Sequence, residues 1–176
     1  MTRILGAILA GGQSRRFGTD KAVACLDGRP LIEHVVAALR RQCDAIVIVG
    51  RPFPGLEALA DRPHPGLGPL GGLAAALHAG QARGFEMVLT APCDTPRLPR
   101  DLVDILSPSP AYLADTQVIG LWPCAAAALL DAHIASNPRR SMLGWAVSIG
   151  AAPRRLALPI VNINTPEDLQ GLADAP

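Results

Sequence analysis

Short apolar runs alternate along the chain with segments of helical periodicity. Residues 3–9 and 45–49 are apolar at nearly every position, and 86–89 form a third such run. Runs of this length predict strands that are covered on both faces of a sheet. After Pro30, residues 30–42 repeat apolar side chains every three or four positions, which is typical of an amphipathic helix. Strands followed by helices in this order predict a mainly parallel sheet.

The middle of the chain continues this alternation after one long interruption. Residues 52–72 are rich in proline and glycine and predict a surface loop, which a helix over 72–81 follows. A third helix is expected over 100–106. Residues 112–121 favour one or two strands, and the alanine-rich segment that continues to residue 150 favours helices.

A helix start is well marked near residue 165. Thr165 precedes Pro166 and two acidic residues, the order of an N-cap, a first helical position and an acidic first turn. Neither a linker nor an internal repeat divides the sequence. We therefore expect one α/β domain over residues 1–176, Rossmann-like, with helices on both faces of a mainly parallel sheet.

Composition narrows the function classes. Apolar residues make up 49% of the 176 residues and the mean hydropathy is +0.27, which excludes intrinsic disorder. A net charge of +1 and 3% aromatic residues give no support to binding of nucleic acid or of an anionic membrane. The apolar start is too short for a leader or a membrane span, so we expect a cytoplasmic protein. The scarcity of large aromatic residues favours a monomer.

Cysteine and histidine show no metal-binding pattern. The four cysteines, at positions 25, 43, 93 and 124, have neither C-x-x-C nor zinc-finger spacing. They are expected to be reduced and mostly buried thiols. The four histidines form no ligand-spaced group and are expected to be structural or surface residues.

Glycine and basic residues crowd the loop after the first predicted strand, whose sequence is LAGGQSRRFGTDK. Gly11 and Gly12 allow a close approach of the backbone to phosphate, and Arg15 and Arg16 supply charge. Lys21 is the only lysine among 16 basic residues. This count indicates a compact ammonium group that a guanidinium cannot replace. The loop fits neither the Walker A nor the Rossmann glycine pattern. Phosphate binding is the favoured interpretation, and a basic surface turn is the alternative.

Two further clusters follow predicted elements. Asp94 lies in TAPCDTP, directly after a buried strand, where one carboxylate can hold Mg²⁺ while phosphates and water complete its shell. Its alternative role is to cap a turn ahead of Pro96. Residues 61–73 combine glycines and prolines before a helix, which suits a base or sugar pocket but equally suits an ordinary turn.

These loops are expected to meet. In sheets of this class, ligands bind outside the carboxyl ends of the strands. The loops that follow Leu9, Val49 and Leu89 should therefore converge on one site at that edge of the sheet.

Five stretches in this order resemble one family over nearly the whole chain: LAGGQSRRFGTDKA, DGRPLIEHV, GPLGGL, APCDTPRLP and NINTPEDL. They resemble the molybdenum cofactor guanylyltransferases, the MobA type within the nucleotidyltransferases. The resemblance implies a nucleotide-diphospho-sugar transferase-like fold. It also implies an Mg²⁺-dependent enzyme that transfers GMP from GTP to the terminal phosphate of molybdopterin and releases pyrophosphate. Transient contact with other cofactor-biosynthesis proteins is implied as well.

The resemblance assigns roles to three groups of residues. It implies nucleotide contacts by Leu9, Ala10, Gly11, Gly12, Lys21, Asp61 and Asp94, the last of which would also bind Mg²⁺. Neutralisation of the triphosphate during catalysis would fall to Lys21, Asp94 with its metal, Arg15 and Arg16. A later part of the pattern would face the pterin substrate and comprises Arg139, Arg140, Asn162 and Asn164.

The chain departs from the family at two places. Val49-Gly50-Arg51 stands where the family often has Asn, and Gln117-Val118 stands where His-Pro is expected. Both departures bear on nucleotide choice and acceptor recognition rather than on phosphate chemistry. A molybdopterin cytidylyltransferase, another small nucleotidyltransferase and a non-catalytic nucleotide or cofactor carrier therefore stay open as alternatives. Retention of both Lys21 and Asp94 favours an enzyme.

Overall fold

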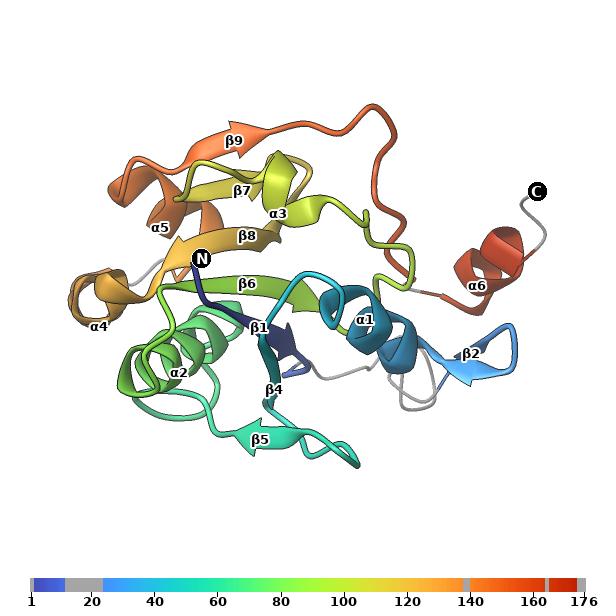
Figure 1. The fold of residues 1–176 in the computed structure, drawn as a ribbon, viewed down its shortest axis with the longest axis horizontal. Helices are drawn as coiled ribbons and strands as arrows, with labels where there is room; N and C mark the ends of the chain where they lie inside the picture. The colour runs from blue at the N-terminus through green and yellow to red at the C-terminus, as the bar shows by residue number, and fades with distance from the viewer. Residues whose placement is uncertain (1, 12–23, 138–139, 164, 174–176) are drawn as a thin grey trace.

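A seven-stranded mixed sheet forms the centre of the protein (Figure 1). The computed structural model describes residues 2–11, 24–137, 140–163 and 165–173. Its strand order is β5-β4-β1-β6-β8-β7-β9. The strands are β1 (Ile4–Leu9), β4 (Ala45–Val49), β5 (Glu57–Leu59), β6 (Met87–Pro92), β7 (Ala111–Leu113), β8 (Thr116–Pro123) and β9 (Ala152–Arg154). Only β8 runs antiparallel to its neighbours, so the predicted mainly parallel sheet is confirmed.

Helices cover both faces of this sheet, as the sequence predicts (Figure 1). The helices are α1 (Leu31–Leu39), α2 (Pro69–Ala82), α3 (Leu102–Ile105), α4 (Ala127–Ser136), α5 (Met142–Ser148) and α6 (Pro166–Ala173), with a 3-10 turn η2 (Cys124–Ala126) before α4. A small hairpin of β2 (Cys25–Leu26) and β3 (Arg29–Pro30) precedes α1.

Two apolar clusters, one on each face, hold the layers together. On one face, α2, α4 and α5 pack against β1, β6 and β8, with Leu5 and Trp122 among the fully buried side chains. On the other face, α1 and α3 pack against Ile8, Ile48 and Leu89. Because successive side chains of a strand point to opposite faces, the continuous apolar run of β1 serves both clusters.

The predicted helix start at residue 165 is confirmed in detail. The backbone N–H of Asp168 donates to the Thr165 hydroxyl oxygen at 3.2 Å. In return, the Thr165 N–H donates to the Asp168 carboxylate at 2.9 Å. This reciprocal pair satisfies two backbone donors that would otherwise have no partner at the start of α6.

Three predictions need correction. The expected loop over 52–72 contains β5 and also the first turn of α2, which begins at Pro69, because proline suits the first helical position. Strand β9 was not expected from the sequence. Of the four cysteines, only Cys124 is buried; Cys25 is exposed and the other two are half-buried, so "mostly buried" is wrong. In the described part of the chain, every helix is too short or too polar to cross a membrane.

Candidate active site

The carboxyl ends of β1, β4 and β6 lie side by side. Leu9, the last residue of β1, is in register with Val49 of β4 on one side and with Pro92 of β6 on the other. The loops that follow these three strands therefore start from one edge of the sheet, as predicted.

A glycine–glycine contact joins the first two of these loops. The Ala10 N–H donates to the Val49 carbonyl at 2.9 Å. Gly50 then adopts a φ of +95°, and a Cβ built there would lie 2.6 Å from Gly11 Cα and 2.7 Å from Gly11 N. Only glycine fits this position without a shift of backbone. The sequence does not predict this contact, because it marks Gly50 only as part of the segment that departs from the family.

A hollow of about 310 Å³ opens beside this contact. Its walls come from the end of β4, from β5 and from the turn that follows, and they comprise Gly50, Arg51, Pro52, Ala58, Leu59, Ala60, Asp61 and Pro65. Ligand pockets of small molecules have volumes of this order. The hollow is thus a candidate for the base or ribose of a nucleotide.

Asp61 lies where the wall of this hollow meets the start of α2. A Cβ on Gly71 would lie 3.2 Å from the Asp61 Cβ, so the turn is packed closely onto the helix. Burial raises the pKa of the Asp61 carboxyl, and a hydrogen bond from the Gly66 backbone lowers it by less. The structure therefore brings Asp61 and Gly50, which adjoins Gly11, to one hollow.

Asp94 lies on the loop directly after β6 and is half-buried. The loop is shaped by the buried Thr95, whose hydroxyl donates to the Pro92 carbonyl at 2.9 Å. The Asp94 carbonyl accepts a hydrogen bond of 3.0 Å from the Ile163 N–H. Residues far apart in the sequence are thereby fixed next to each other at the edge that carries Leu9.

Asn162 comes to the Asp94 loop through this bond. It is half-buried, and its side-chain Oδ1 is buried without a hydrogen-bond partner. A buried acceptor with no partner costs free energy unless a ligand or water supplies a donor. The resemblance assigns Asn162 to the pterin substrate, and that role stays a prediction.

The Asp94 loop could hold a divalent metal ion through one carboxylate. Among the described residues, no group of three or more His, Cys, Asp or Glu side chains could enclose a metal ion. Mg²⁺ is usually held by one or two carboxylates, with phosphate oxygens and water at its other positions. The half-buried Asp94 carboxylate at the edge of the sheet meets that requirement.

Most of the chain matches the sequence model of one protein family. Residues 6–145 match the MobA-like NTP transferase domain. The chain belongs to this family.

The relatives of this MobA-like NTP transferase align with almost the full length of the chain. A molybdenum cofactor guanylyltransferase of Rhodobacter capsulatus is 40% identical and covers 98% of this chain and 96% of its own. A protein of the same name from Acidiphilium cryptum is 36% identical, with coverages of 96% and 93%. The crystal structure of molybdopterin-guanine dinucleotide biosynthesis protein A from Archaeoglobus fulgidus shares the fold, with a TM-score of 0.69, 23% identity and 97% of both chains covered. The chain is thus a nucleotidyltransferase.

Several residues that are predicted to bind substrate in this MobA-like enzyme lie outside the part of the chain that the structure describes: Gly12, Arg15, Arg16, Lys21, Arg139 and Asn164. Their roles stay predictions. Arg140 is described and exposed, just ahead of α5, and its proposed contact with the acceptor also stays a prediction.

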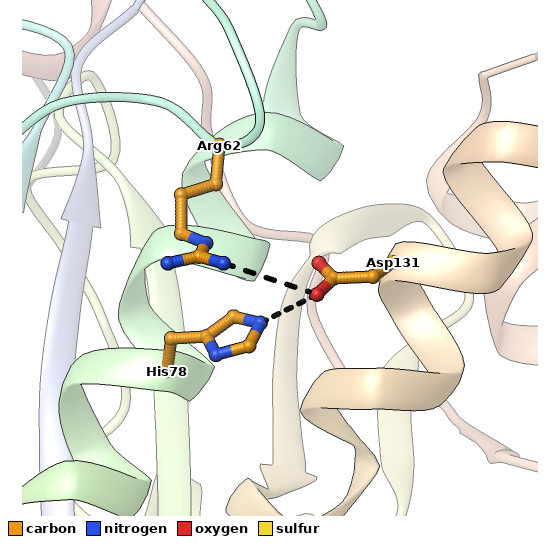
Figure 2. A network of polar contacts seen from close by, with 3 residues as sticks. All are labelled: Arg62, His78 and Asp131. Atoms are coloured by element: carbon orange, nitrogen blue, oxygen red, sulfur yellow. Dashed lines mark hydrogen bonds and ion pairs between the residues drawn. The ribbon is translucent and has the colours of Figure 1, made fainter.

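One group of polar residues beside the site was not singled out as functional from the sequence. Figure 2 shows Arg62, His78 and Asp131 turned toward one another, from the turn before α2, from α2 and from α4. His78 Nε2 lies 2.8 Å from Asp131 Oδ2, and Arg62 Nη2 lies 4.0 Å from the same oxygen. Since His78 and Asp131 are 53 residues apart, no local sequence pattern could have linked them.

Proposed function

We propose that the chain transfers GMP from GTP to the terminal phosphate of molybdopterin. The observation that carries the proposal is the meeting of three segments at one edge of the sheet. They are Ala10-Gly11 (the Gly11 turn), the hollow lined by Gly50 and Asp61 (the Asp61 hollow) and the loop that follows β6 (the Asp94 loop). The names of the relatives supply the acceptor and the nucleotide. Their identity of 40% and 36% over nearly the whole chain supports the same reaction here.

In this reaction an oxygen of the acceptor phosphate forms a bond to the α-phosphorus of GTP. The bond between the α-phosphorus and the bridging oxygen breaks, and pyrophosphate leaves with that electron pair. A phosphate monoester is already ionised at neutral pH, so the reaction needs no general base. The chain has instead to bring two anions together, which requires positive charge and fixed donors around the phosphates.

The chain's own groups divide this work. Backbone amides of the Gly11 turn would orient the α-phosphate, because the glycine contact with Gly50 fixes that turn on β4. Lys21, Arg15 and Arg16 would neutralise the triphosphate and the departing pyrophosphate.

Asp94 would hold Mg²⁺ at the phosphates. When bound, the metal ion supplies further positive charge to the reacting and leaving oxygens. Asn162, with its unpartnered Oδ1 next to the Asp94 loop, would accept a hydrogen bond from the pterin acceptor.

Nucleotide choice depends on the hollow beside Gly50. Asp61 would accept hydrogen bonds from the guanosine, and Arg51 supplies positive charge to the same walls. Arg51 belongs to the segment in which the chain departs from its family, so a cytidylyltransferase is the second candidate. Either reaction would draw on nucleoside triphosphates of the cytoplasm, within one domain over residues 1–176 that acts as a monomer.

The first experiment compares thermal unfolding with Mg²⁺ and, separately, GTP, CTP, ATP and UTP. A nucleotide at 100 times its dissociation constant should raise the free energy of unfolding by about 2.7 kcal/mol. Selective stabilisation by GTP would support guanylyl transfer, and selective stabilisation by CTP would replace it with cytidylyl transfer.

The second experiment measures pyrophosphate release with GTP and molybdopterin. Asp94→Asn should lower kcat by about 100-fold or more, the usual scale for loss of a group that acts on developing charge. Asp104→Asn is the matched control, because Asp104 is an exposed aspartate on α3. Lys21→Arg should also lose rate, since the longer guanidinium cannot replace a compact ammonium. Binding of GTP without any release of pyrophosphate would instead support the carrier.

A further inference from the structure

Arg62 is anchored at two points of the fold. Its backbone N–H donates to the Gly71 carbonyl, in the first turns of α2, at 3.1 Å. Its guanidinium reaches in the other direction, to 4.0 Å from Asp131 of α4 (Figure 2). Arg62 directly follows Asp61, so the placement of its backbone also sets the placement of the Asp61 side chain in the hollow.

Asp131 is itself held in place by α2. His78 Nε2 lies at hydrogen-bond distance, 2.8 Å, from Asp131 Oδ2. The other carboxylate oxygen, Oδ1, is buried and has no hydrogen-bond partner. A carboxylate with one buried oxygen that lacks a hydrogen-bond partner favours a nearby cation. Arg62 is the cation that faces it (Figure 2).

The position of this group argues against a role in packing alone. Side chains on α2 and α4 already bury an apolar interface, which includes Leu77 and Leu130. The polar group adds a connection from that interface to a turn outside it, and this turn carries Asp61. Half of the Arg62 side chain is exposed, so the ion pair contributes little to overall stability.

We propose that Asp131, oriented by His78, is a positioning residue for the nucleotide hollow. It draws the Arg62 guanidinium toward α4 and so fixes the Asp61 turn in the geometry that binds the nucleoside. This inference rests on the proposed role of Asp61 in binding GTP. It extends the site to α4, none of whose residues the sequence pattern or the resemblance assigns to nucleotide binding.

The expected signature is a change in binding without a change in chemistry. Asp131 would act through Arg62 on the Asp61 turn rather than on the phosphates, so its effect should be the same in the ground state and in the transition state. Asp131→Asn and Arg62→Gln should each raise the Kd and KM for GTP by about three- to ten-fold, with kcat within two-fold of the original. The double variant should be no weaker than the worse single variant, because both changes break the same connection.

The matched controls are Glu57→Gln and Arg83→Gln. These residues form an exposed ion pair of 2.6 Å between the start of β5 and the far end of α2. Their removal tests the loss of a similar charge pair that does not reach the Asp61 turn. Both controls should leave the Kd for GTP unchanged. Asp131→Glu keeps the carboxylate and should recover part of the lost affinity.

The assays are calorimetric titration with GTP and Mg²⁺, pyrophosphate release and thermal unfolding, applied to the full chain. Suppose that Asp61→Asn weakens GTP binding. An unchanged Kd for GTP in both Asp131→Asn and Arg62→Gln, with or without a lowered Tm, would then overturn the inference. If Asp61→Asn leaves the Kd unchanged, the proposed role of Asp61 fails and the inference fails with it. Should Asp131→Asn fold poorly, Arg62→Gln decides the question, since its side chain is half-exposed.

Discussion

Gly50→Ala tests how tightly the first two loops of the site are packed. The added methyl group would sit 2.6 Å from Gly11 Cα, a distance that real Cβ atoms essentially never show. The atom that must move belongs to backbone rather than to a flexible side chain. The substitution therefore has to displace either the Gly11 turn or the end of β4.

Two costs add at this position. An alanine at a φ of +95° is strained by about 1–2 kcal/mol. Alanine also reduces the conformational entropy of the unfolded chain, which offsets part of this cost. Forcing an extra carbon into packed backbone costs about 1–3 kcal/mol more. We expect a total loss of about 2–4 kcal/mol in the free energy of unfolding. For a chain of this size, such a loss lowers the Tm by roughly 4–16 °C.

Gly55→Ala separates the two costs. Gly55 has a φ of +77°, similar to that of Gly50, but a Cβ there would meet nothing within 4 Å. This control should lose only the cost of the backbone conformation, about 1 kcal/mol. Urea unfolding gives the two losses, and GTP-induced stabilisation reports whether the Gly11 turn has moved.

The outcome that refutes the reasoning is equal destabilisation. If Gly50→Ala loses no more stability than Gly55→Ala, the contact with Gly11 is not tight. If Gly50→Ala is the less stable variant and also loses GTP-induced stabilisation, the contact shapes the nucleotide turn as proposed.

Two further predictions follow from the ionisable groups. Burial raises the pKa of Asp61, so the folded chain binds this proton more tightly than the unfolded chain, and the free energy of unfolding falls as pH rises from the usual aspartate pKa through the raised one. Asp61→Asn should remove that fall in urea unfolding measured from the usual aspartate pKa upward, and identical pH slopes would contradict the assignment. Burial and the neighbouring Asp44 raise the pKa of Cys43 to about 12, and burial raises that of Cys124 to about 11. Iodoacetamide near neutral pH should therefore modify the exposed Cys25 first and these two thiols only after unfolding, as peptide mass spectrometry would show.

Strong local patterns predicted the parts of the fold that carry them. The five apolar residues 45–49 became β4 with the same bounds, because a strand covered on both faces needs apolar residues at every position. The N-cap at Thr165 could also be predicted from the sequence, because its hydrogen bonds lie within one helical turn. Such signals depend on neighbouring residues alone.

Two of the strands that the sequence did not predict, β5 and β9, lack any local signal. The sequence of β5 is Glu-Ala-Leu and that of β9 is Ala-Pro-Arg. Each has three residues and lies at an edge of the sheet, where proline and charge are tolerated. These segments are strands because β4 and β7 offer them unpaired edges, which is a property of the tertiary structure.

The candidate site was likewise predictable from the sequence only in part. The convergence of the loops after β1, β4 and β6 followed from the parallel order of strands, and it placed Asp61 and Asp94 at one edge. The close approach of Gly11 and Gly50 depends on the distance between two loops, and the Asp131 group depends on the contact of α2 with α4. Neither distance is encoded in spacing along the chain.

The hydrogen bond from Ile163 to the Asp94 carbonyl has a consequence for the order in which the enzyme is made. A ribosome delivers the Gly11 turn, the Asp61 hollow and the Asp94 loop well before residue 163. The segment that is bonded to the Asp94 loop and brings in Asn162 is therefore the last part of the site to be synthesised, and the Asp94 loop lacks this hydrogen bond until the chain is nearly complete.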